Sequence, residues 1–147
     1  MLVSHVLAKA QERLATIQVD SPVRAAAALM AKPHVELVAV CDQLGKLVGV
    51  LAKTDIVRQI SHCAGNSCTT GVGAIMTRDV VVCREREWLG DAWASMKARR
   101  LPRLPVLDQE DHPVGILYAR DVLQAMLAEA EDQESLLRDY VMGVGYH

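Results

Sequence analysis

The chain has 147 residues, a formal net charge of −2 and a hydrophobic content of 51%. This length and composition are typical of one compact domain, or of two small halves that share one core. Nucleic-acid binding normally requires a basic surface, so the weakly acidic balance argues against it. Two Trp, three Tyr and no Phe also leave few rings for stacking on single-stranded bases.

The first residues lack the apolar segment of a secretory signal, because Lys9, Glu12 and Arg13 fall where that segment would run. The longest uncharged run, residues 59–77, could be mistaken for a membrane span. It contains several polar side chains and three glycines, which favour a linker. The sequence therefore predicts a cytoplasmic protein that has no membrane partner.

The first predicted element is a short strand in which Ile17 and Val19 alternate with polar residues. Ser21 and Pro22 are then predicted to begin a helix, with Ser21 as the N-cap and Pro22 as the first helical residue. Spacings of three and four residues place an apolar group on one face of this helix: Val23, Ala26, Ala27 and Met30.

A β-hairpin and a second helix are predicted next. The apolar runs at 35–40 and 46–52 are typical of strands, and residues 42–45 between them are typical of a turn. The second helix then begins with Thr54 or Asp55 as its cap. The order of elements in this unit is β-α-β-β-α.

A segment rich in Gly, Ser, Thr and Asn, residues 61–71, is predicted to link this unit to the next. It contains Cys63 and Cys68 beside His62. Structural zinc sites need more tightly paired ligands and no CxxC motif is present, so no metal is predicted. A thiol-linked redox role for these two cysteines stays open as a further hypothesis.

An internal repeat determines the rest of the interpretation. The segment 16–60 aligns with 82–126 without a gap, and ten of the 45 pairs are identical, among them Asp55 with Asp121. The second unit is therefore expected to repeat the β-α-β-β-α order. Its first strand is VVVC, its first helix covers residues 88–97, and its hairpin strands are RLPVLD and HPVGILY.

Neither unit, at about 60 residues, buries enough surface to be stable alone. We therefore predict an α/β (α+β) fold in which two β-α-β-β-α units pack together with pseudo-twofold symmetry. The expected division is 1–68 for the first unit with an N-terminal helical segment and linker, 69–130 for the second unit, and 131–147 for a C-terminal helical extension and tail. Clefts between the units are the expected places for small ligands.

Four sequence motifs point to a known family. VGVLAKTDIV and VGILYARDVL carry a hairpin strand into the second helix of each unit, AIMTRDVV opens the second unit, and RLPVLD forms its hairpin strand. Together they resemble the CBS domain, in which the last motif is usually written RHLPVVD. From about residue 3 to about residue 128, the chain resembles a stand-alone CBS pair, or Bateman module.

The resemblance implies an adenosine-containing ligand in a cleft between the units, such as AMP, ADP, ATP, NAD(H) or S-adenosylmethionine. In family members the Asp at the start of each second helix accepts hydrogen bonds from the ribose hydroxyls, and here these residues are Asp55 and Asp121. A carboxylate suits this role because, when ionised, it only accepts hydrogen bonds. The resemblance also assigns Arg103 to the phosphates, with Arg120 as a second partner.

The cleft with Asp121, Arg103 and Arg120 is accordingly the predicted ligand site. Three apolar residues are expected to flank the base there: Val82, Val106 and Ile116. The cleft of the first unit is the alternative, and its candidate residues are Asp55, Thr54 and Lys53.

The chain departs from the family pattern at three positions. Many nucleotide-binding repeats carry Ser or Thr three residues before the Asp, and here Ala52 and Tyr118 stand at those positions. In the first unit, the position of Arg103 is occupied by Leu37, which has no charge. The arginine-bearing cleft is therefore favoured over the first-unit cleft.

No catalytic arrangement is evident. The five histidines are scattered, GNSCTTG lacks the Lys of a phosphate loop, and Asp42 and Asp108 occupy equivalent hairpin turns where Asp is the expected turn residue. We therefore predict a non-catalytic module with no required cofactor, which binds an adenosine derivative and signals to an unknown protein partner. The alternative function is a ligand-free dimeric scaffold that binds another protein.

A homodimer is also predicted. The first helix of each unit offers apolar residues beyond what one buried face needs, namely Ala25, Ala28, Leu29, Trp93 and Met96. CBS pairs commonly dimerise through these helices, so the resemblance implies the same association.

Residues 121–142 are predicted to form one long amphipathic helix, and residues 143–147 are expected to fray. Its polar face carries Glu129, Glu131, Asp132 and Glu134. Its apolar stripe needs a covering surface, either the second copy or another protein: Leu123, Met126, Leu127, Leu136, Leu137 and Tyr140.

Overall fold

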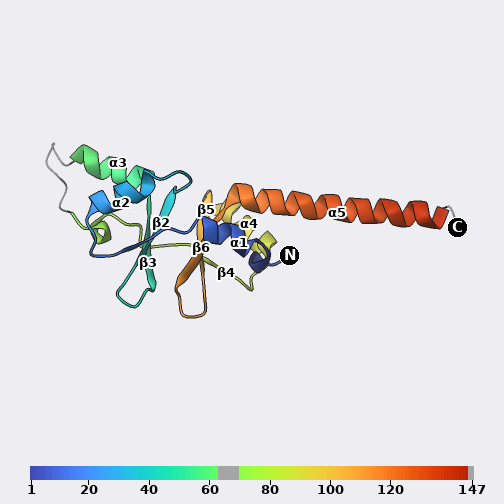
Figure 1. Ribbon diagram of the computed structural model, residues 1–147, viewed down its shortest axis with the longest axis horizontal. Coiled ribbons are helices and arrows are strands. Elements are labelled where there is room, and N and C mark those ends of the chain that lie inside the picture. The colour runs from blue at the N-terminus through green and yellow to red at the C-terminus, as the bar shows by residue number, and fades with distance from the viewer. Residues whose placement is uncertain (63–69, 146–147) are drawn as a thin grey trace.

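The computed structural model of the chain describes residues 1–62 and 70–145, with side chains as far as residue 141. Two small three-stranded sheets carry helices around them, and one long helix extends away from the body (Figure 1). The predicted α/β class and the repetition of one unit are confirmed.

The first unit forms a sheet with the strand order β1-β2-β3. β1 (Thr16–Gln18) pairs in parallel with β2 (Leu37–Cys41), and β2 pairs antiparallel with β3 (Leu47–Ala52). α2 (Val23–Met30) connects β1 to β2, and α3 (Lys53–His62) follows β3. The second unit repeats this arrangement.

In the second unit, β4 (Cys83–Arg84) pairs in parallel with β5 (Arg103–Leu107), which pairs antiparallel with β6 (Pro113–Tyr118). α4 (Leu89–Arg99) connects β4 to β5, and α5 (Ala119–Gly145) follows β6. The strand predicted at VVVC is thus shorter than expected, because only its last residue and the next one are paired as strand.

The strand register repeats with the same offset as the sequence. Ile17 lies opposite Val40 in the first sheet, and Cys83 lies opposite Val106 in the second. Because a slip of one residue would turn every side chain to the other face, this agreement places equivalent residues on equivalent faces. Positions that the sequence repeat aligns can therefore be compared directly in the structure.

Two helix starts differ from the sequence-based expectation. Ser21 does not cap α2, because Pro22 is the N-cap and the helix begins at Val23. α3 begins at Lys53, which makes Asp55 its third residue rather than its cap. Asp55 Oδ2 instead accepts a hydrogen bond from the Ala52 backbone N–H at 2.9 Å, as an acidic residue in the first helical turn commonly does.

The N-terminal segment packs against the second unit, not the first. It comprises the 3₁₀ helix η1 (Val3–Val6) and α1 (Leu7–Glu12), and both Val3 and Ala10 belong to the second unit's core. Ala10 lies so close to Gly115 on β6 that a Cβ at position 115 would meet Ala10 Cβ at 2.8 Å.

The segment before the second unit packs in the same way on the first unit. η2 (Val72–Ala74) and the residues after it place Val72 and Met76 in the first unit's core. A Cβ at Gly49 would meet Met76 Sδ at 2.5 Å. At the offset of the repeat, Gly49 is equivalent to Gly115 and Ala10 to Met76, so the pseudo-symmetry extends to the segments that precede each unit.

Three groups of buried side chains hold the chain together. One core lies within each unit, and a third lies between the sheets, where Leu37 and Ala39 of β2 meet Ile116 and Tyr118 of β6. This third group joins the two units into one folded body. The apolar area that it buries between the sheets stabilises their contact by about 25 cal/mol per Å².

The predicted C-terminal helix is confirmed as one helix of 27 residues. It runs on to Gly145, so the fraying expected from residue 143 does not occur as far as that residue. Most of its apolar stripe is exposed, whereas Met126 packs partly on the second core. Glu129, expected on the polar face, is half-buried. Within residues 1–62 and 70–145, no helix combines the length and apolar content that a bilayer-spanning segment needs.

The expected dimer faces on α2 and α4 are only partly available. Ala28 is exposed, and Ala25, Leu29 and Trp93 are half-buried. Met96 is 2% exposed and belongs to the core of the second unit. Met96 is therefore a core residue, since it points inward from α4 as its equivalent Met30 does from α2.

Burial is expected to protect Cys83 from alkylation. Burial of the Cys83 thiol, with a smaller effect of the Glu87 charge, raises its pKa to about 12. At pH 8 the reactive thiolate is then a fraction on the order of 10⁻⁴. In folded protein, peptide mass spectrometry should find Cys83 unmodified by iodoacetamide, and in guanidinium chloride it should be fully modified. Rapid labelling of the folded chain at Cys83 would contradict this packing.

Candidate functional site

The first of two related clefts lies beside Asp55, between the two units. Its walls come from both units and are mostly apolar: Leu37, Val50 and Ala52 from the first unit, and Val80, Val81, Leu101, Pro102 and Pro105 from the second. Its polar residues are Asp55, Thr77, Asp79 and Arg103. We call this space, about 190 Å³ in volume, the Asp55 cleft.

Asp55 presents a carboxylate to this cleft from the first turn of α3. One of its oxygens, Oδ2, accepts the Ala52 N–H, and the other, Oδ1, lies 3.7 Å from an Arg58 nitrogen that is mostly in solvent. The Asp55 side chain is 14% exposed. Its Oδ1 can therefore accept a further hydrogen bond from a group that enters the cleft.

Arg103 brings a positive charge to the lining of the Asp55 cleft, which also carries the carboxylates of Asp55 and Asp79. Arg103 donates a hydrogen bond to the carboxylate of Glu36. Burial opposes ionisation of Glu36, but the hydrogen bond and charge of Arg103, with further attraction from Arg120 and Lys53, lower its pKa below the ordinary value. Three cationic side chains thus act on the Glu36 carboxylate, and of these Arg103 also lines the Asp55 cleft, where its guanidinium can attract an anionic group.

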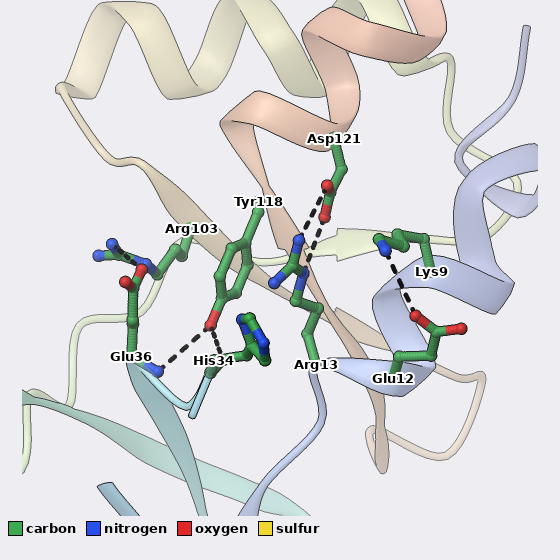
Figure 2. Close-up of polar contacts among 8 residues, drawn as sticks. All are labelled: Lys9, Glu12, Arg13, His34, Glu36, Arg103, Tyr118 and Asp121. Atoms are coloured by element: carbon green, nitrogen blue, oxygen red, sulfur yellow. Dashed lines mark hydrogen bonds and ion pairs between the residues drawn. The ribbon is translucent and has the colours of Figure 1, made fainter. Parts of the chain in front are cut away.

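At the equivalent position beside Asp121, the chain's own Arg13 and Tyr118 take up the space next to the carboxylate (Figure 2). The hollow that remains outside them, about 340 Å³, is lined, among the residues that the structure describes, by polar side chains and not by apolar ones: Lys9, Glu12, Arg13, His34 and Arg120. Arg13 Nε donates to Asp121 Oδ2 at 3.0 Å, and Arg13 Nη2 donates to Oδ1 at 3.1 Å. The two side chains are 10% and 7% exposed. This bidentate pair uses both oxygens of the carboxylate that was predicted to hold a ribose, and the bond to Asp121 raises the pKa of Arg13 despite burial.

Tyr118 closes the same space. Its hydroxyl donates to the His34 carbonyl at 2.8 Å and accepts the Glu36 N–H at 3.2 Å. Its ring lies 4.4 Å from the Arg13 guanidinium carbon. With 2% of its surface exposed, Tyr118 is a packed core side chain at the position that Ala52 occupies in the first unit.

The structure does not bring the predicted ligand residues together in one cleft. Asp121 and Arg103 both approach Tyr118, but each has its own ion-pair partner, and Arg103 lines the cleft of Asp55. Arg120 lies 5.3 Å from the Tyr118 ring on the exposed side of the helix start. Asp121 and Arg103 do not share one cleft as expected, because Arg13, which lies just before β1, forms an ion pair with Asp121.

The apolar residues expected around the base lie elsewhere. Val106 is fully buried in the second core, and Ile116 is fully buried between the sheets, so neither is open to a ligand. Val82 lines a different hollow, beside Asp42 and Arg78. The side chains of Lys53 and Thr54 are exposed.

Sequence reasoning missed the roles of Arg13, Glu36 and Asp79. Arg13 and Asp79 lie just before the two aligned segments, and continuing the offset of the repeat pairs them with each other. The opposite charges at these two equivalent positions are the sequence signal that the two clefts differ. Glu36 gave no such signal, because its contact with Arg103 joins residues 67 positions apart.

Metal-ligand clusters are absent from the described residues, where no three His, Cys, Asp or Glu side chains converge. Cys63 and Cys68, considered above as linker thiols, lie outside the described residues. Cys41 and Cys83 are buried, reduced and separate from both clefts.

Comparison with known proteins agrees with this architecture. The CBS domain family model matches residues 3–62 and again residues 72–128. The CBS domain pair of protein MJ0100, solved in complex with 5′-methylthioadenosine and S-adenosyl-L-methionine, superposes with a TM-score of 0.72 at 26% identity, over 88% of this chain and 98% of that one. CBSX2 in complex with AMP gives a TM-score of 0.67 at 26% identity, over 80% and 90%.

Relatives known by sequence are longer proteins. Inosine-5′-monophosphate dehydrogenase of Methanocaldococcus jannaschii is 32% identical over 109 residues, which are 74% of this chain and 21% of the relative. The γ3 subunit of the 5′-AMP-activated protein kinase of Bos taurus is 23% identical over 120 residues, which are 78% of this chain and 24% of the relative. The chain spans about a fifth to a quarter of such relatives. Matched twice by the family model and folded as two like units, the chain belongs to the CBS domain family and contains one CBS domain pair.

Proposed function

We propose that this CBS pair is a non-catalytic regulatory module that binds an adenosine-containing ligand in the Asp55 cleft and signals to a protein partner. The observation that carries the proposal is the arrangement of that cleft: apolar walls from both units, an available carboxylate oxygen on Asp55, and the guanidinium of Arg103 in the lining. These three features correspond to a base, a ribose and a phosphate.

Each part of the ligand has a chemical partner in this arrangement. The base would lie between Val50 and Val81 or Pro105, where apolar walls favour a flat ring. The ribose hydroxyls would donate to Asp55, because an ionised carboxylate only accepts. Phosphate oxygens would accept from Arg103, whose planar guanidinium suits that geometry.

Related proteins support the choice of ligand class. A CBS pair of similar fold has been solved with 5′-methylthioadenosine and S-adenosyl-L-methionine, and another with AMP. Every one of these ligands contains adenosine. The free volume of about 190 Å³ is below the 300–1,000 Å³ of typical ligand pockets. We therefore expect the phosphates to project from the cleft towards Arg103 and Lys53.

The signal is proposed to reach α5 through the cleft wall. Leu101 and Pro102 line the cleft, and the Pro102 carbonyl accepts a 2.8 Å hydrogen bond from the N–H of Ala119, the first residue of α5. A ligand that shifts or stiffens this wall acts directly on the start of the helix. Population of one α5 orientation would then change with the ligand concentration.

Binding should be visible as thermal stabilisation. At a ligand concentration a hundred times Kd, AMP is expected to stabilise the fold by about 2.7 kcal/mol, or about 5 to 10 °C in Tm. Isothermal titration calorimetry with AMP, ATP, adenosine and S-adenosylmethionine would rank the ligands. Absence of heat and of any Tm shift with all four would overturn the sensor function and leave the scaffold function.

Arg103 should set the preference for phosphate. In the unmodified chain, AMP or ATP is expected to bind about tenfold to a hundredfold more tightly than adenosine, because each charge-assisted hydrogen bond contributes about 1.5 to 3 kcal/mol. Arg103→Ala should remove most of that difference while leaving adenosine affinity unchanged. Arg24→Ala, which removes an exposed arginine of α2 that does not line the cleft, is the matched control. Equal preference for phosphate in both variants would show that Arg103 does not bind it.

We propose that two chains associate as a homodimer. Half-buried apolar residues on α2 and α4 and exposed ones on α3, Val57 and Ile60, remain to be covered. The exposed stripe of α5 adds to this surface. The same stripe favours the second candidate function, a scaffold that binds another protein without a ligand. Titration with adenosine derivatives distinguishes the scaffold from the sensor, because only the sensor binds them.

We propose that the chain is divided into the first unit with its linker (1–68), the second unit (69–130) and the C-terminal extension (131–147). We also propose a cytoplasmic location. Reduced thiols such as Cys41 and Cys83 persist in that compartment. The partner would be a separate protein or a further part of a longer one.

A further inference from the structure

We infer that the Asp121 cleft is permanently occupied by Tyr118 and Arg13, which take the place of a ligand there, so that each chain binds one adenosine derivative and not two. This inference rests on the proposed function of the Asp55 cleft and defines its stoichiometry. It is carried by the geometry of two positions at which the pseudo-symmetric halves differ.

The first position is residue 118, which is equivalent to residue 52. Ala52 ends β3 with a single methyl group, and that methyl lines the open Asp55 cleft. Tyr118 ends β6 with a ring that is 2% exposed and held at its hydroxyl by His34 O and Glu36 N. A second planar ring has no room where this ring packs, because protein interiors are filled to crystal-like density.

The second position is residue 13, which is equivalent to residue 79. Asp79 lines the open cleft and is exposed, and so leaves Asp55 available to a hydroxyl donor. Arg13 instead donates to both oxygens of Asp121, at 3.0 and 3.1 Å. A ribose would have to displace a bidentate, nearly buried ion pair, and a neutral hydroxyl is a weaker donor than a guanidinium.

The two side chains also support each other. The Arg13 guanidinium lies 4.4 Å from the centroid of the Tyr118 ring, in a cation–π contact (Figure 2). Arg103 and Arg120 lie 5.3 Å from the same ring. Opening the cleft would therefore break the ion pair, the hydroxyl contacts and the ring contacts together.

Calorimetric stoichiometry with AMP tests the inference directly. The unmodified chain should bind one AMP per chain. Ala52→Tyr, which places in the open cleft the side chain that fills the closed one, should lower the affinity for AMP by about thirtyfold or more. Ala52→Ser is the matched control of small volume and should keep the affinity. Circular dichroism and Tm would verify that both variants fold.

Each outcome separates the inference from the proposed function. Two AMP per chain would overturn the inference and leave the function intact. One AMP per chain that still binds normally to Ala52→Tyr would overturn both the inference and the proposed site, because the ligand would then lie outside the Asp55 cleft. No AMP bound to the unmodified chain would overturn the proposed function and, with it, the stoichiometry of one.

A gain of binding provides a second measurement. Tyr118→Ala combined with Arg13→Gln should give the second cleft the shape of the first and free Asp121 for a hydroxyl donor. A second AMP per chain is expected, at a Tm lowered by about 10 °C, since the change breaks a buried ion pair. A folded double variant that still binds one AMP would show that something other than these two side chains closes the cleft.

Discussion

Asp55→Asn is expected to weaken AMP binding about tenfold to a hundredfold. The asparagine carbonyl can still accept the Ala52 N–H, so the first turn of α3 keeps its hydrogen bond. The variant loses the charged carboxylate that is proposed to accept hydrogen bonds from the ribose hydroxyls. A hydrogen bond to a charged group contributes about 1.5 to 3 kcal/mol. Calorimetry at a temperature well below Tm would measure the change in Kd.

Asp121→Asn is the matched control, because it makes the same chemical change at the pseudo-equivalent residue. It should leave the Kd for AMP unchanged, since Asp121 is already paired with Arg13. It should also lower Tm, because Arg13 then loses its charged partner in a site that is only about 10% exposed. Reversed results, with binding lost in Asp121→Asn and kept in Asp55→Asn, would show that the ligand occupies the other cleft.

Much of the fold could be predicted from the sequence, because each element predicted in one unit can be checked against the equivalent segment of the other. A hairpin predicted at 35–52 is supported by the equivalent hairpin of the second unit, and both formed as expected. The first strand of the second unit was predicted too long, because VVVC is apolar throughout and periodicity gives no end point. The division at 1–68 groups the N-terminal segment with the first unit, whereas the segment packs on the second unit. Helical spacing alone does not identify the sheet that a helix covers.

The site was less predictable because it depends on contacts between residues far apart in sequence. The family pattern identified Asp55 and Asp121 equally, and the choice between them followed the nearby arginines. We propose the reverse choice, because Arg13 pairs with Asp121 and Arg103 lines the cleft of Asp55. Both contacts join different units, so neither follows from the local sequence of one repeat.

Tyr118 illustrates the same point at one residue. In the sequence, Tyr118 and Ala52 both stand where many repeats carry Ser or Thr, so the two positions look alike. In the structure they differ, because the Ala52 methyl group leaves its cleft open and the Tyr118 ring fills the equivalent space. Side-chain volume, not the missing hydroxyl, separates the two clefts.

Leu137→Lys in α5 is expected to convert the proposed dimer to a monomer at micromolar concentration. α5 extends well beyond the body of the chain (Figure 1), and Leu136, Leu137 and Tyr140 are 65 to 71% exposed there. An isolated helix is marginally stable in water, so this arm needs a covering surface. Burial of one Leu contributes about 1.5 to 3 kcal/mol and a dimer loses two, which raises the dissociation constant about 10² to 10⁴-fold.

Ser135→Lys separates the effect of the apolar face from that of added charge. Residues two apart on a helix face nearly opposite directions, so Ser135 carries the same new charge away from Leu137. Sedimentation equilibrium should give a mass near twice 16.1 kDa for the unmodified chain and for Ser135→Lys, and near 16.1 kDa for Leu137→Lys. Deleting residues 133–147 should give the monomer as well. If all of these chains sedimented as monomers, the stripe would not be a dimer surface; if all remained dimers with unchanged Tm, α2, α3 and α4 would form the dimer contact and the stripe would be left for another protein.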